Sequence, residues 1–186
     1  VAMFGTYQIA ANGVAQSIWS LAALIGSAMG PVFITVIGQC MGAKDVDQAK
    51  FYFSKLIKWS LAFSIVWNVL VLAMTPFILQ FYNLANETKH LIIILVIIHN
   101  IANTVVFPLS GPLSQGLRAT GDVKFTMIVS IASTVGGRLV LSIILALGLH
   151  LGVIGIALAM CGDWTIRAII FYYRYKSNAW TKFEVI

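Results

Sequence analysis

Long, nearly uninterrupted apolar stretches alternate with short polar connections along the whole chain. A helix needs about 20 mostly apolar residues to cross the hydrocarbon core of a bilayer. Five stretches reach that length, and they cover residues 8–39, 55–81, 90–117, 124–148 and 152–175. The strands of a membrane β-barrel would be shorter and would alternate in polarity. The pattern therefore predicts an all-α, polytopic membrane helical bundle with about five transmembrane helices.

Composition supports a lipid environment. The chain is 60% hydrophobic and only 10% charged, with a mean hydropathy of +0.92, whereas a soluble domain is about 25% charged. Cys40 falls at one predicted helix end and Cys161 near the centre of another helix, so no disulfide is expected. Membrane lipid is the expected partner of most of the surface.

The placement of the basic residues predicts an orientation. Nine of them lie around connections at one end of the predicted bundle, and only Lys89 lies at the other end. Such a bias marks the cytoplasmic side, so the C-terminal tail, 176–186, should be cytoplasmic. Because the basic residues are spread over separate connections, we expect no nucleic-acid partner. The nine are Lys44, Lys50, Lys55, Lys58, Arg118, Lys124, Arg174, Lys176 and Lys182.

Several spans carry regularly spaced polar residues. In the first span, Gln8, Asn12, Gln16 and Ser20 recur every four residues and so share one helix face. Polar groups are costly against lipid, so this face should meet other helices or a water-filled cavity, two alternatives that the pattern leaves open. Gly26, Gly30 and Pro31 are expected to interrupt this span.

The third span has a similar character. Asn100 and Asn103 lie beside His99, and Pro108 and Pro112 follow them. A proline-broken polar span is typical of a moving or substrate-lining element, but a static kink fits equally well. We interpret His99 as a hydrogen-bonded packing residue rather than a proton carrier.

Two ionisable residues lie at mid-depth in the last two spans. Arg138 precedes the connection near His150 by twelve residues and Asp163 follows it by thirteen. At about 1.5 Å per residue, both lie roughly 18–20 Å from the connection. Since charges inside a membrane usually pair, we predict an Arg138–Asp163 ion pair, with Arg167 sharing it or extending toward the cytoplasm. We favour a structural clamp over a coupling-ion site.

Signatures of catalysis are absent from the sequence. No Walker loop occurs, and no cysteine–histidine cluster has the spacing of metal ligands. We therefore expect no enzyme activity, no catalytic residues, no bound metal and no cofactor.

Four segments resemble one family. Residues 38–45, Gly-Gln-Cys-Met-Gly-Ala-Lys-Asp, followed by Ala49, resemble a junction of the multidrug and toxic compound extrusion (MATE) family. Residues 116–124 resemble its Leu-Arg-Gly-x-Gly-Asp connection, with Ala119 in place of the usual glycine. Residues 162–167 and 173–180 resemble the end of its bacterial members.

This resemblance implies a fold and an activity. Family members have twelve helices in two six-helix lobes, and residues 1–186 resemble the second, C-terminal lobe without its first helix. The missing N-terminal lobe and preceding helix would then be partners, and we expect the chain to be a fragment of a multi-pass protein of the bacterial cell (inner/plasma) membrane. The family exports drugs and organic cations, amphipathic small molecules, in exchange for sodium or protons.

The resemblance also suggests site residues. The chain would contribute half of the substrate cavity, through Gln16, Ser20, Asn68, Asn100 and Asn103. Na⁺ or H⁺ is the coupling ion expected for the full-length transporter, but the acidic residue that sodium-driven members often carry in the tenth helix has no counterpart in residues 90–117. Two alternatives remain: a lipid-linked oligosaccharide flippase of the same superfamily, or a non-transporting membrane scaffold subunit.

Overall fold

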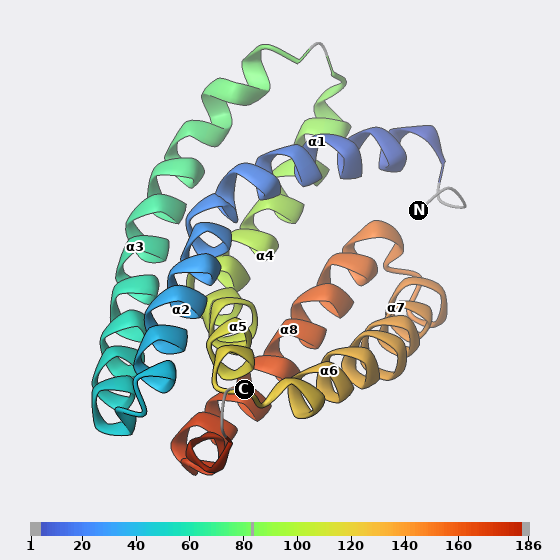
Figure 1. Ribbon diagram of the computed structural model, residues 1–186. Helices are drawn as coiled ribbons and strands as arrows, with labels where there is room; N and C mark the ends of the chain where they lie inside the picture. Colours follow the sequence, from blue (N-terminus) through green and yellow to red (C-terminus); the bar gives the residue numbers. More distant parts are fainter. Residues whose placement is uncertain (1–4, 83, 184–186) are drawn as a thin grey trace.

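The structure is a computed structural model that describes residues 5–82 and 84–183, and its regular elements there are helices (Figure 1). Five helical stretches are long and apolar enough to cross a membrane. The predicted all-α class with five spans is thus confirmed. The α-helices are α1 (Thr6–Ala22), α2 (Leu24–Gly42), α3 (Val46–Gln80), α4 (Asn86–Ser110), α5 (Pro112–Ala119), α6 (Val123–Ala132), α7 (Val140–Ile143) and α8 (Gly152–Lys176).

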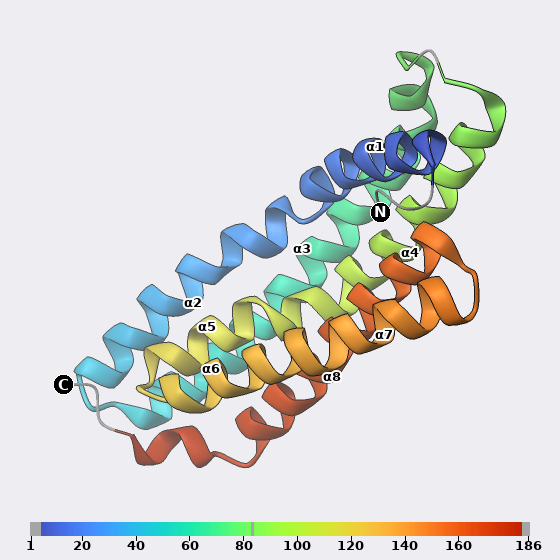
Figure 2. The same cartoon turned by 90° about the vertical axis from the view of Figure 1, so that its right-hand side faces the viewer.

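Two apolar clusters hold the bundle together. One lies near the α3–α4 connection and joins α1, α3, α4 and α8 through small and branched residues such as Ala11, Ala15 and Leu95. The other lies at the basic end and joins α2, α3, α5 and α8 through Phe33, Phe53 and other residues. The long helices run side by side between these ends (Figures 1 and 2).

The fourth span forms an outer layer of the bundle. It consists of α6, the π-helical segment η2 (Ser133–Leu139), α7 and a second π segment, η3 (Ile144–Gly148), and it runs beside α8 (Figure 2). Only 6% of its most apolar window is buried. Its exposed Ile128, Ile131 and Val135 side chains suit contact with lipid.

The first span breaks at a position that the sequence analysis did not predict. Ala23 separates α1 from α2, and Pro31 lies inside α2 rather than at the interruption. The indole Nε1 of Trp67 donates a hydrogen bond to the Leu21 carbonyl oxygen at 2.8 Å. A side chain that binds a helix carbonyl is one cause of helix kinks, so α3 explains the break better than Pro31 does.

Two other boundaries also differ from the prediction. The second span begins at Val46, nine residues before Lys55, because the Asp45 carboxylate caps α3 by accepting a hydrogen bond from the Gln48 amide at 2.9 Å. The third span is divided at Gly111, after which Pro112 begins α5.

The C-terminal segment packs against the bundle. A short 3₁₀ helix, η4 (Ala179–Lys182), carries Trp180, which is fully buried. Its ring centroid lies 4.9 Å from that of Phe53, and its indole N–H donates to the Tyr175 carbonyl oxygen at 3.1 Å. The predicted tail, 176–186, is therefore folded onto α3 as far as the structure describes it; residues 184–186 lie outside the described residues.

Candidate functional site

Asp163 is the centre of a buried polar cluster between α8 and η2. Its carboxylate is fully buried and lies 2.7 Å from Nη2 of Arg167, one helical turn away. Ser133 of η2 donates its hydroxyl to the other carboxylate oxygen. The two partners supply charge and a hydrogen bond, which a buried carboxylate requires. The Ser133–Asp163 hydrogen bond thus connects the last two spans.

The predicted Arg138–Asp163 ion pair is wrong. Arg138 Nη2 instead lies 2.8 Å from the Met160 sulfur, one turn closer to the α7–α8 connection than Asp163. The prediction assumed an α-helical rise on both sides of the hairpin. η2 and η3 are π-helical, and i→i+5 bonding lets the chain advance less per residue than in an α-helix. This brings Ser133, rather than Arg138, opposite Asp163.

An aromatic cluster lies next to Asp163 along α8. Trp164 stacks on Trp19 of α1 with ring centroids 5.6 Å apart and meets Phe107 of α4 edge-on at 5.4 Å. The His99 ring of α4 lies 6.5 Å from each of the two indoles. These four rings, which we call the aromatic cluster, join α1, α4 and α8 at mid-depth.

Two polar side chains of α4, His99 within this cluster and Asn103 beside it, have buried polar atoms without hydrogen-bond partners among the described residues. His99 Nδ1 lies 2.8 Å from the Leu95 carbonyl, which can only accept, so Nδ1 carries the proton and Nε2 of the neutral ring is a free acceptor. That Nε2 and both amide atoms of Asn103 have no hydrogen-bond partner among the described residues. Asn103 lies between His99 and Phe107 on one face of α4. Water or a polar ligand would satisfy these groups.

The five predicted cavity residues fall into two sets. Asn68, Asn100 and Asn103 are buried inside the bundle, whereas Gln16 is half-buried and Ser20 is exposed. The buried face of α1 consists instead of Ala11, Ala15, Ile18 and Ala22. The five residues therefore do not share one surface here, and their common role in a cavity stays a prediction.

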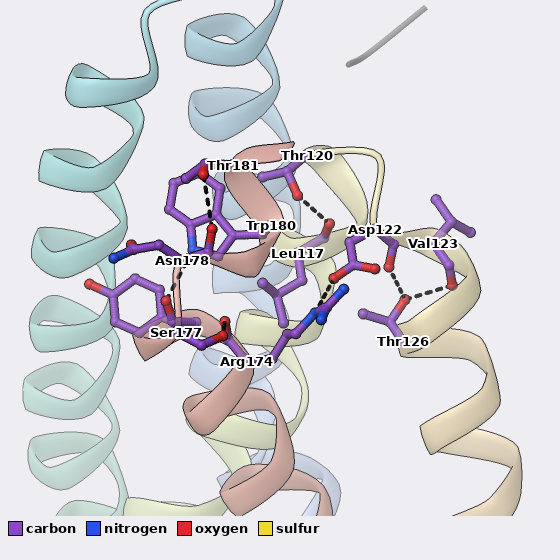
Figure 3. A network of polar contacts seen from close by, with 11 residues as sticks. Leu117, Thr120, Asp122, Val123, Thr126, Arg174, Ser177, Asn178, Trp180 and Thr181 are labelled. Carbon is purple, nitrogen blue, oxygen red and sulfur yellow. Dashed lines mark hydrogen bonds and ion pairs between the residues drawn. The ribbon is translucent and has the colours of Figure 1, made fainter. Parts of the chain in front are cut away.

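Sequence reasoning missed a polar network at the basic end. Asp122, which is 2% exposed, pairs with Arg174 at the end of α8 at 2.7 Å. The same aspartate accepts a hydrogen bond from Thr126 through its backbone carbonyl (Figure 3). Gly121 has a φ of 94°, which favours glycine. The Gly121-Asp122 sequence between α5 and α6 could have indicated this ion pair, because the turn places the Asp122 carboxylate next to α8.

The described residues contain no group of three or more His, Cys, Asp or Glu side chains that could hold a metal ion.

Comparisons with known proteins identify relatives of the chain. The sequence model of the MatE family matches residues 1–144. The chain is 26% identical over 184 residues to the "Uncharacterized transporter YisQ" of Bacillus subtilis (strain 168), covering 97% of the chain and 39% of YisQ. It is 28% identical over 181 residues to the "Multidrug export protein MepA" of Staphylococcus haemolyticus (strain JCSC1435), covering 97% of the chain and 40% of MepA. The chain thus spans about two fifths of the length of these curated relatives. No solved structure matches it.

Proposed function

This chain belongs to the MatE family, and from that premise we propose that it forms the second lobe of a bacterial membrane antiporter. The antiporter would export drugs or organic cations in exchange for sodium or protons. The family match over residues 1–144 is the observation that carries this proposal. The printed name of MepA, a multidrug export protein, supports the choice of cargo.

The bundle has the features that such a lobe needs. Its five spans present broad apolar faces to lipid, and buried amides on α3 and α4 offer polar groups away from lipid. Asn103 provides both a donor and an acceptor without protein partners. In this proposal it binds water or cargo during the transport cycle.

The Asp163 cluster has a mechanical role in the proposal. A carboxylate already bound by Arg167 and Ser133 has little capacity left for an ion. It holds α8 against η2, so the two spans move as one body when one lobe rocks against the other. Coupling would then reside elsewhere in the transporter.

Dye export by the full-length protein in proteoliposomes tests this function. Asn103→Leu should reduce gradient-driven ethidium export about tenfold or more, because it removes the unpartnered amide from the protein interior. Leucine has the same number of side-chain heavy atoms and adds no unpaired polar group, so the variant should still fold. Exposed Ser17, whose hydroxyl binds only the Gly13 carbonyl of its own helix, supplies the control: Ser17→Ala should export at the unaltered rate.

Three outcomes would contradict the proposal. Wild-type vesicles without export under either a proton or a sodium gradient would favour a scaffold subunit. Translocation of a lipid-linked oligosaccharide without ethidium export would favour the flippase. Export by residues 1–186 alone would show that the N-terminal lobe is unnecessary.

A further inference from the structure

We propose that a pocket at the basic end of the bundle binds the headgroup of an anionic phospholipid. The pocket lies between α3, the end of α4 and the end of α8, and its volume is about 330 Å³. This headgroup pocket is lined by Lys58 and Lys176, by the hydroxyl-bearing Ser54, Tyr172 and Tyr175, and by apolar residues including Leu61.

The charges of the headgroup pocket favour an anion. Its two lysines come from different helices, and no acidic residue among the described residues lines it. Neither lysine forms an ion pair with a carboxylate in the described part of the chain, whereas Lys50, on the same helix as Lys58, pairs with Asp47 at 3.2 Å. The hydroxyl groups can donate further hydrogen bonds to phosphate oxygens. A phosphodiester would therefore find two positive charges and several donors.

The depth of the pocket points to a lipid as the source of that phosphate. A helix crosses the hydrocarbon core in about 20 residues. Counted back from Gln80, where α3 ends, that length reaches residue 61, one turn from Lys58. The same count from the start of α8 at Gly152 reaches residue 171, next to Tyr172 and five residues before Lys176. Two helices that run in opposite directions thus place both lysines at the same membrane boundary, where phospholipid headgroups lie.

Neighbouring residues match the remainder of a phospholipid. Trp59 and Phe63, which follow Lys58 on α3, are 54% and 47% exposed and stack with centroids 5.2 Å apart. Exposed aromatic residues are typical of the membrane interface. Ile57, Leu61 and Leu109 give the pocket an apolar side that an acyl chain can contact. Basic pockets between membrane helices on the cytoplasmic side are known to bind acidic headgroups.

Lipid binding to the purified full-length protein tests this inference. The protein, stripped of native lipid in detergent, would be titrated with phosphatidylglycerol or with neutral phosphatidylcholine and followed by native mass spectrometry. Phosphatidylglycerol should bind more tightly, and replacing both lysines (Lys58→Gln with Lys176→Gln) should weaken its binding about 30-fold, since each lysine accounts for about fivefold. Phosphatidylcholine binding should change little.

A control variant at two other lysines distinguishes binding in the pocket from a general attraction to the basic end of the bundle. Lys55→Gln with Lys182→Gln removes the same charge from the same end of the bundle but outside the lining, and should change the affinity less than twofold. Equal losses in both double variants, or no loss in the pocket variant, would overturn the inference. Displacement of the lipid by millimolar inorganic phosphate would also overturn it, because the site would then serve a soluble anion. Since the readout is binding, failure of the proposed transport function would leave this result unaffected.

Discussion

Replacing Asp163 by alanine should destabilise the protein by about 3–5 kcal/mol, which is the usual cost of removing one partner of a buried ion pair. Asp163 is fully buried, and the Arg167 side chain is only 20% exposed. Removing the carboxylate leaves the guanidinium without its acidic partner and removes the side-chain acceptor of the Ser133 hydroxyl. Thermal unfolding of the detergent-purified full-length protein, followed by circular dichroism, measures the change.

Further variants test whether the loss comes from the buried ion pair. Asp47→Ala removes an exposed ion pair with Lys50 and should cost less than about 1 kcal/mol. Asp163→Leu combined with Arg167→Met should recover most of the loss, because apolar residues of similar size often replace buried ion pairs without penalty. Arg138→Met should be milder than Arg167→Met, since Arg138 contacts Met160 rather than the carboxylate. Normal folding of Asp163→Asn with abolished ion coupling would contradict the clamp.

Gly155→Ala should destabilise the protein by about 3 kcal/mol or more, at or above the upper end for overpacking. A β-carbon at this position of α8 would lie 2.6 Å from the backbone carbon of Leu145 and 2.7 Å from the backbone nitrogen of Ala146. Backbone atoms cannot rotate away as a side chain can, so η3 and α8 must separate. Small residues allow such close approach between membrane helices. The same thermal unfolding measurement detects the loss.

At a glycine with free space around it, substitution by alanine should stabilise the protein instead. Gly38 lies inside α2, and a β-carbon there would meet nothing within 4 Å. Gly38→Ala should therefore stabilise the protein by up to about 1 kcal/mol, because alanine favours the helix over glycine. Equal effects of the two substitutions would show that α8 and η3 are not in contact as described.

The spans themselves could be predicted because hydrophobic length alone defines them. Nine of the ten predicted starts and ends lie within four residues of the observed helix boundaries, as at Gln80 and Gly148. The start of α3 could not be found this way, since residues 46–54 are helical through the Asp45 cap rather than through apolar content. Hydropathy reports membrane crossing, not helix length.

The buried contacts were less accessible to sequence reasoning. Asp163 and Arg167 were recognised as inward-facing because charges are costly in lipid, but the partner of Asp163 depended on π-helical geometry in η2. The break at Ala23 depended on Trp67, a residue 46 positions from its acceptor Leu21. The Asp122–Arg174 pair likewise joins positions 52 residues apart. Such pairings are set by packing between helices, which a single sequence does not report.

The predicted topology places five helices across a bilayer with their basic ends in the cytoplasm, and cysteine labelling measures it. With Cys40 and Cys161 replaced by alanine, single cysteines would be placed at Lys89, His150, Lys44 and Ser177 of the full-length protein and exposed to a membrane-impermeant maleimide. In intact spheroplasts, K89C and H150C should label, whereas K44C and S177C should label only after the membrane is opened. Labelling of all four in intact spheroplasts, or the reverse pattern, would contradict this topology.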